Sequence, residues 1–190
     1  MNMQALTDLL RETLRDPRGV AAALMRMGVP MQARWVALAL MAVASALLTH
    51  VGMAMMLASD ELGSTIMMPS PVATALTQFG VLIATSAIAA WAGRWAGGQG
   101  RFADAVLLMA WLQFVLLVVQ VAQMVVLLLV PPLGVLLGYV ALALFFWLLT
   151  AFVAELHGFR SLGLTFIGVI LTVLAAAFVL ALLLYPVLEA

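Results

Sequence analysis

The centre of the sequence reads Arg94-Trp95-Ala96-Gly97-Gly98-Gln99-Gly100-Arg101-Phe102-Ala103-Asp104-Ala105, a charged and glycine-rich interruption of an otherwise apolar chain. Three glycines beside two arginines and an aspartate do not suit a helix that faces lipid, because charged groups are costly in hydrocarbon. Backbone groups in hydrocarbon must also be hydrogen-bonded within helices or closed barrels. The stretch therefore predicts a loop outside the membrane, between two membrane spans.

The composition places the chain among integral membrane proteins. It has 190 residues, of which 67% are hydrophobic and 8% are charged, and its mean hydropathy is +1.23. A water-soluble fold of this length could not bury so much apolar surface. The formal net charge is zero, so we expect no nucleic-acid partner. Cysteine is absent, which excludes disulfides, iron–sulfur clusters and thiolate zinc sites.

Residues 3–28 predict two short amphipathic helices at the membrane surface. The first would place Leu6, Leu9, Leu10 and Leu14 on one face, with charged residues on the other. Asp16 and Pro17 are suited to the N-cap and the first turn of the second helix. We treat 1–34 as a cytoplasmic amphipathic N-terminal segment and 35–190 as a five-helix transmembrane domain.

Five apolar segments are long enough to cross a hydrocarbon core of about 30 Å. They cover about 35–57, 72–92, 105–130, 133–153 and 162–185. The uncharged Pro131-Pro132 pair predicts a tight reversal, so the third and fourth spans should form an antiparallel hairpin. The expected fold class is all-α: a polytopic membrane protein with five transmembrane helices and an N-terminal amphipathic interfacial helical segment.

The distribution of charge predicts the orientation. Five spans put the two ends of the chain on opposite sides of the membrane. With the N-terminus in the cytoplasm, all eight arginines lie inside, whereas Asp60, Glu61 and Glu189 lie outside, as the positive-inside rule requires. The exclusive use of arginine over lysine is typical of a GC-rich bacterial genome. We therefore expect a multi-pass protein of the cell inner membrane, with a cytoplasmic N-terminus and a periplasmic C-terminus.

Ionisable and glycine residues of two cytoplasmic loops form a candidate binding face. Such a face would suit a phosphate, a lipid headgroup or a protein. The alternative is that these charges only stop membrane transfer and pair locally between the loops. The expected partners are membrane lipids and another membrane protein or a second copy of the chain. The candidate residues are Arg94, Gly97, Gly98, Gly100, Arg101, Phe102, Asp104, Glu155, His157 and Arg160.

A stripe of amides inside the second and third spans is a candidate intramembrane polar stripe. At about 100° per residue, the glutamines of the third span fall on one side of the helix. They would line a path for a substrate or an ion, or they would hydrogen-bond neighbouring helices and hold the bundle together. The stripe consists of Gln78, Gln113, Gln120 and Gln123.

We predict no catalytic residues, no metal site and no cofactor. The sequence contains no nucleophile elbow, P-loop, HExxH motif or paired catalytic carboxylates. One group of histidine and methionine side chains, which we call the soft-donor group, has imidazole and thioether ligands that suit Cu(I). Methionine is also an ordinary packing residue. That group, left open as an alternative, consists of His50, Met53, Met55, Met56, Met67 and Met68. Small residues at four-residue spacing predict that helices approach each other closely. They are Gly134 with Gly138, and Ala89 with Gly93 and Gly97.

The layout resembles the Yip1 domain family. The resemblance rests on Asp16-Pro17 within an amphipathic N-terminal stretch, on the glycine-rich loop from Arg94 to Ala105, on Pro131-Pro132, and on the segment from Trp147 to Gly158. It implies five spans with a cytoplasmic N-terminus. Eukaryotic members are associated with vesicle trafficking and with Rab GTPases through a longer N-terminal region than this chain has.

These patterns favour a non-enzymatic integral membrane scaffold of the Yip1 type that binds a partner at its cytoplasmic face. The expected roles are membrane organisation or trafficking-like processes. The alternative is a small transporter or permease with a polar path between the second and third spans.

Overall fold

The computed structural model describes residues 3–59 and 69–188, and the side chains of 3–55 and 69–182. The described residues form seven helices and no strand. The two N-terminal helices are α1 (Met3–Arg15) and α2 (Pro17–Arg26), as the sequence predicts. The N-cap is also confirmed, because the Asp16 side chain accepts a hydrogen bond from the backbone N–H of Gly19 at 2.9 Å.

Five helices are long and apolar enough to cross a membrane, which confirms the predicted fold class. They are α3 (Met31–Ser59), α4 (Pro71–Trp95), α5 (Phe102–Leu129), α6 (Pro131–His157) and α7 (Leu162–Leu188). Most of their ends lie beyond the predicted span ends, since helix continues past the apolar core, whereas α5 ends at Leu129, just before its predicted end, and α7 begins at the predicted residue. The chain is a multi-pass membrane protein.

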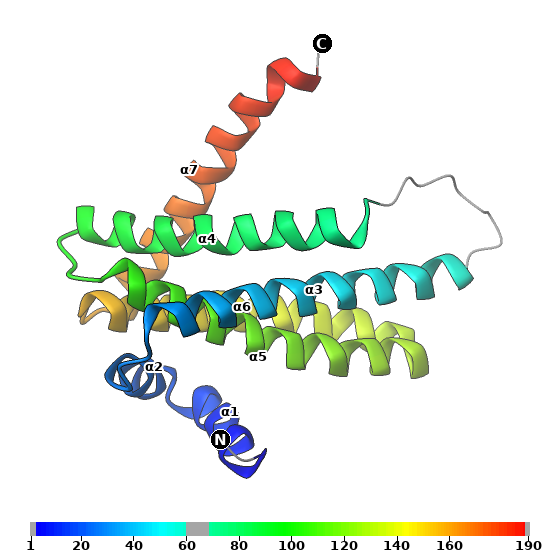
Figure 1. Ribbon diagram of the computed structural model, residues 1–190, viewed down its shortest axis with the longest axis horizontal. Coiled ribbons are helices and arrows are strands. Elements are labelled where there is room, and N and C mark those ends of the chain that lie inside the picture. The colour runs from blue at the N-terminus through cyan, green and yellow to red at the C-terminus, as the bar shows by residue number, and fades with distance from the viewer. Residues whose placement is uncertain (1–2, 60–68, 189–190) are drawn as a thin grey trace.

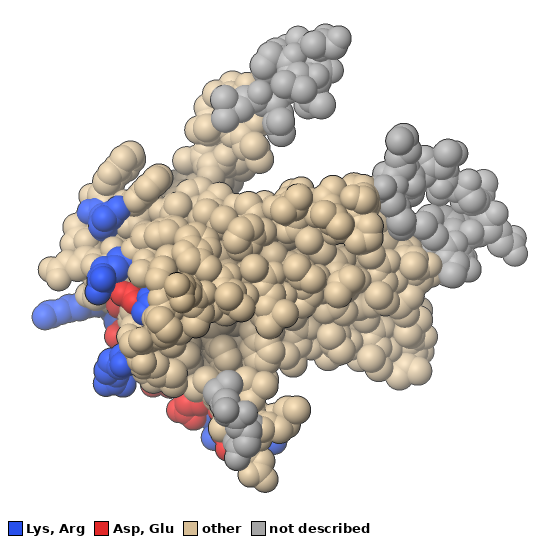
Figure 2. Space-filling view, in the orientation of Figure 1, with Lys and Arg blue, Asp and Glu red and all other residues tan. Residues whose placement is uncertain are grey.

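Helices α3, α4, α5 and α6 lie side by side along the long axis, whereas α7 runs obliquely to them and extends away from the bundle (Figure 1). The two N-terminal helices gather near one end, where α2 packs against α6 and α5. Buried residues are concentrated in the first half of α5 and the last third of α6. Arginine and acidic side chains gather at this same end (Figure 2), which we call the charged end. The tightest packing therefore supports the charged end of the bundle.

The predicted hairpin between the third and fourth spans is present. Val130 alone separates α5 from α6, and Pro131 opens the new helix. A Cβ atom added to Gly134 would overlap the backbone and side chain of Leu127, so only glycine fits this close crossing. The spacing of Gly134 and Gly138 thus serves packing against α5 within the chain.

Candidate functional site

Helices α4 and α6 end in the same way at the charged end. Each is followed by a glycine in the left-handed conformation, Gly97 with φ of 87° and Gly158 with φ of 72°. The next residue then bonds back into the helix: the N–H of Gly98 donates to the Gly93 carbonyl, and that of Phe159 donates to the Ala154 carbonyl, both at 2.8 Å. These are Schellman motifs, which need glycine because the left-handed conformation is strained for residues with a Cβ atom.

His157, the last residue of α6, is buried between the two turns. The backbone N–H of Gly100 donates to its Nδ1 atom at 3.0 Å. Its Nε2 atom lies 3.0 Å from the Ala89 carbonyl oxygen of α4. A backbone N–H can only donate, so Nδ1 carries no proton, and Nε2 carries the hydrogen that is donated to Ala89. Both ring nitrogens of His157 are thus used to join α6 to α4 and to the glycine-rich loop.

Three glycines leave the space that the imidazole occupies. A Cβ atom on Gly93, Gly98 or Gly100 would overlap the ring of His157. The fourth side is covered by Phe159, whose ring stacks on the imidazole at a centroid separation of 5.4 Å and an interplanar angle of 21°. The glycines of this loop are therefore required for packing as well as for the turn. We call this arrangement the histidine clamp.

The two carboxylates of the candidate face are paired, but with arginines from the N-terminal part of the chain. Asp104, in the first turn of α5, lies 2.7 Å from Arg34, whose Nε also donates to the Val29 carbonyl. Glu155 lies 3.0 Å from Arg18, which also donates to the Phe159 carbonyl at 3.1 Å. These pairs fix the starts of α3 and α2 to the ends of the bundle helices.

Helix α1 is fixed to the bundle by a buried hydrogen bond. The indole N–H of Trp111 in α5 donates to the hydroxyl of Thr13 at 3.0 Å, and Thr13 is fully buried. Leu6, Leu9 and Leu10 of the predicted apolar face pack against the core, whereas Leu14 is half exposed. The apolar face of α1 therefore packs on protein over most of its length.

Three arginines of the candidate face point to solvent. Arg94, Arg101 and Arg160 are exposed, and none of them forms an ion pair with a carboxylate in the described part of the chain. Phe102, another residue of the candidate face, packs against Trp35, with ring centroids 6.1 Å apart. These three arginines of the candidate face are thus exposed, while the two carboxylates of that face, Asp104 and Glu155, are held by internal pairs.

The candidate residues therefore fall into two groups. Those that build the framework are Gly97, Gly98, Gly100, Phe102, Asp104, Glu155 and His157, and those free to contact a partner are Arg94, Arg101 and Arg160. Sequence reasoning missed Arg18, Arg34 and Gly93 as members of the site. Gly93 carried a signal, since it lies one helical turn before Gly97.

The predicted polar stripe makes direct hydrogen bonds to neighbouring helices. The amide of Gln78 donates to the Thr49 hydroxyl at 3.3 Å, and that of Gln113 donates to the Ser45 hydroxyl at 3.2 Å, both on α3. Gln123 donates to the Gly134 carbonyl across the hairpin at 3.2 Å. Gln120 is half-buried on α5. Gln78 of α4 and Gln113 of α5 thus both bond to α3, and Gln123 bonds across the hairpin.

The soft-donor group is only partly described. His50 Nε2 lies 3.5 Å from the Thr74 hydroxyl, and His50 Nδ1 is buried without a hydrogen-bond partner in the described part of the chain. The side chain of Met56, with Met67 and Met68, lies outside the described residues. Among the residues that are described, no group of three or more His, Cys, Asp or Glu is placed to hold a metal ion.

Comparison with protein families places these features in a known domain. The Yip1 domain model matches residues 11–183. The chain belongs to the Yip1 domain family. The Yip1 domain therefore includes α2 to α6 in full, with the histidine clamp and both internal ion pairs. It is not a known enzyme family. Neither a search of curated proteins nor one of solved structures finds a match.

Proposed function

We propose that this Yip1 domain is a non-enzymatic scaffold of the bacterial inner membrane, and that its charged end binds an acidic segment of another membrane protein in the cytoplasm. The observation that carries the proposal is the division of charge at this end. Asp104 and Glu155 are held by Arg34 and Arg18, whereas the arginines of the loop are exposed. Exposed arginines on an ordered loop favour an acidic partner.

The charge at the same end of the bundle supports the proposed orientation. Arginine side chains gather there (Figure 2), and the positive-inside rule assigns such an end to the cytoplasm. The N-terminus and the glycine-rich loop would then lie inside the cell. The amphipathic helices α1 and α2, which pack beside this end, would lie on the same side.

The geometry of His157 supports a role without catalysis. A general base must present a free ring nitrogen to its substrate, yet backbone groups of Gly100 and Ala89 occupy both nitrogens of His157. Phe159 and three glycines enclose the ring. The residue is therefore suited to joining α6 to α4 and to the glycine-rich loop.

The glutamine geometry supports the scaffold over the transporter. An aqueous path requires polar groups that are open to water, whereas Gln78 and Gln113 are engaged by hydroxyls of α3. Such direct bonds between helices stabilise a membrane bundle. We therefore assign the polar stripe to helix packing.

The test is site-specific photo-crosslinking in the native membrane. A photoreactive residue at Gln99, which is exposed between the two loop arginines, should capture one discrete protein. The crosslink should disappear in the Arg94→Gln/Arg101→Gln variant, because the acidic segment loses its counter-charges. The charge control is Arg11→Gln on α1, which should keep the crosslink.

A photoreactive residue at Pro69, exposed before α4 at the other end of that helix, provides the position control and should not capture the same protein. Crosslinking at Gln99 that persists unchanged in the Arg94→Gln/Arg101→Gln variant would contradict the proposal. So would a Gln99 adduct consisting only of lipid.

A further inference from the structure

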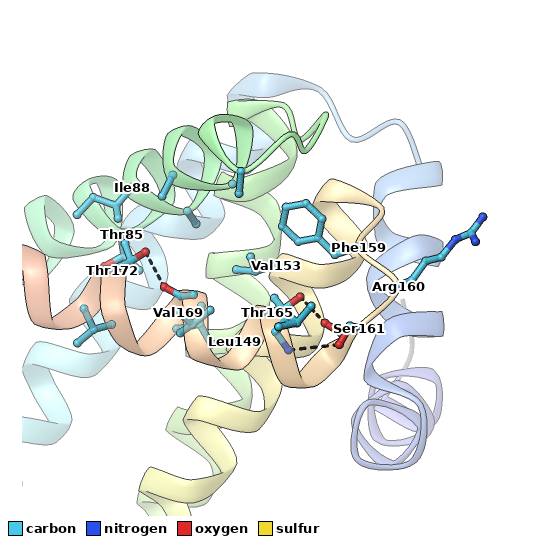
Figure 3. Close-up of a pocket in the computed structure, with 17 residues that line it drawn as sticks. Thr85, Ile88, Leu149, Val153, Phe159, Arg160, Ser161, Thr165, Val169 and Thr172 are labelled. Carbon is cyan, nitrogen blue, oxygen red and sulfur yellow. Dashed lines mark hydrogen bonds between the residues drawn. The ribbon is translucent and has the colours of Figure 1, made fainter.

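Helix α7 leaves an open cleft beside the bundle. It packs against α6 near its start and then diverges from α4 (Figure 1). The cleft between α4, the end of α6 and α7 has a volume of about 520 Å³ (Figure 3). A second groove of about 460 Å³ continues it along α4 and α7, and the two share Ile88, Ala92 and Thr172.

The interior of the cleft is apolar despite its hydroxyl groups. Each threonine donates its hydroxyl to a carbonyl of its own helix: Thr85 to Val81 at 2.8 Å, Thr165 to Ser161 at 2.9 Å and Thr172 to Gly168 at 2.7 Å. Their hydrogen-bond donors are therefore already used. The remaining lining is mainly aliphatic side chains and small residues such as Ala89. A hydrocarbon chain could lie beside these threonines without leaving their hydroxyl donors unpaired.

The mouth of the cleft carries a positive charge. Arg160 lines the mouth, and its guanidinium extends away from the cavity toward the charged end (Figure 3). It is exposed and has no carboxylate partner among the residues that the structure describes. An apolar interior with an arginine at its rim complements an amphiphile that has an anionic head.

We propose that this cleft binds an anionic phospholipid, with an acyl chain between α4 and α7 and the phosphate beside Arg160. The apolar lining and the single arginine at the rim favour a lipid with an anionic head. The cleft holds about 520 Å³. That volume falls within the range of about 300–1,000 Å³ that is usual for small-molecule sites.

This lipid site is separate from the partner surface proposed above, which depends on Arg94 and Arg101. It is tested on the purified full-length chain, with no partner present. Native mass spectrometry from mild detergent would measure retention of added phosphatidylglycerol against phosphatidylcholine with the same acyl chains. One arginine near the headgroup should favour phosphatidylglycerol by about fivefold.

Two variants test the binding of the lipid headgroup and of the acyl chain separately. Arg160→Gln should reduce phosphatidylglycerol retention about fivefold, to the level of phosphatidylcholine. Gly168→Leu should reduce retention of both lipids, because Gly168 lines the cleft and a Cβ there meets nothing within 4 Å. Its side chain would thus fill the cleft without straining the fold.

The matched controls are Arg11→Gln, which removes the same charge elsewhere, and Gly163→Leu. Gly163 lies on the same helix outside the cleft lining and also has open space around a Cβ. Both controls should retain lipid as the unmodified chain does. Equal retention of the two lipids, or no effect of Arg160→Gln, would overturn the proposal. A dimer that only Gly168→Leu dissociates would assign the cleft to a second copy and overturn it as well.

Discussion

The backbone N–H of Gly100 donates to Nδ1 of His157 across a distance of 3.0 Å, and this bond joins the glycine-rich loop to the end of α6. The other ring nitrogen of His157 bonds the Ala89 carbonyl of α4. One imidazole therefore holds three segments of the charged end in place. This buried contact thus holds the backbone of the loop that carries the exposed arginines.

Replacing His157 should loosen the charged end. His157→Ala leaves the Gly100 N–H and the Ala89 carbonyl without partners and empties the space between three glycines. A buried group left unpaired costs about 1–3 kcal/mol, so we expect a loss of about 3 kcal/mol in the free energy of unfolding. Thermal unfolding in detergent would measure it, and trypsin should cleave faster at Arg94 and Arg101.

The matched control is His50→Ala. His50 has one long contact of 3.5 Å, and its Nδ1 atom has no partner in the described part of the chain. This variant should change the free energy of unfolding by less than His157→Ala does. Equal losses for the two variants would contradict the clamp.

Replacing glycine by alanine inside a helix usually raises the free energy of unfolding, but at a glycine that lines the clamp the same replacement should lower it. Alanine is favoured over glycine in a helix interior by about 0.5–1 kcal/mol, and Gly80→Ala in α4 should show this gain because nothing lies near its Cβ. Gly93→Ala in the same helix should instead lower the free energy of unfolding by about 2 kcal/mol, because the new methyl group would overlap His157. A stabilising Gly93→Ala would disprove the packing role of this glycine.

The pair formed by Arg34 and Asp104 should be worth far more than a surface pair. The two side chains are 8% and 18% exposed, and removing one partner leaves the other charge largely buried. Asp104→Ala should lower the free energy of unfolding by about 3 kcal/mol. The control is Asp8→Ala, which breaks a pair at 4.0 Å with Arg11 whose side chains are more than 70% exposed. It should have an effect of about 0.5 kcal/mol or less.

The hydrogen bond between Thr13 and Trp111 should hold α1 on the bundle. Thr13→Val keeps the shape of the side chain but leaves the Trp111 indole N–H unpaired, so hydrogen exchange in α1 should become faster. Thr7→Val is the control, because the exposed Thr7 hydroxyl bonds only to carbonyls of its own helix. Adding Trp111→Phe to Thr13→Val should recover part of the protection, since neither polar group is then left buried. Unchanged exchange in Thr13→Val would show that the apolar face alone holds α1.

The spans could be predicted because each segment that crosses a membrane must be apolar and must satisfy its backbone hydrogen bonds within itself. A helix in hydrocarbon satisfies its own backbone groups, so about 20 apolar residues indicate a span without knowledge of its neighbours. The Asp16 cap and the Pro131 turn are equally local, and both appear where the sequence indicates them. Features of this kind need only a short window of residues.

The partners within the site could not be predicted in the same way. Arg34 lies 70 residues from Asp104, and Arg18 lies 137 residues from Glu155. Nothing in the local pattern distinguishes these arginines from the others in the chain. The sequence indicated that the two loops come together, but the proximity of His157 to three glycines depends on how the ends of α4 and α6 pack.

The central claim is that the exposed arginines of the charged end face the cytoplasm, and single-cysteine labelling tests it most directly. The chain has no cysteine, so Gln99→Cys and Pro69→Cys each introduce one thiol at an exposed position on either side of α4. With a membrane-impermeant maleimide applied to spheroplasts, Pro69→Cys should be labelled at once. Gln99→Cys should react only after the membrane is opened. Labelling of Gln99→Cys in sealed spheroplasts would contradict the orientation and the proposed partner surface.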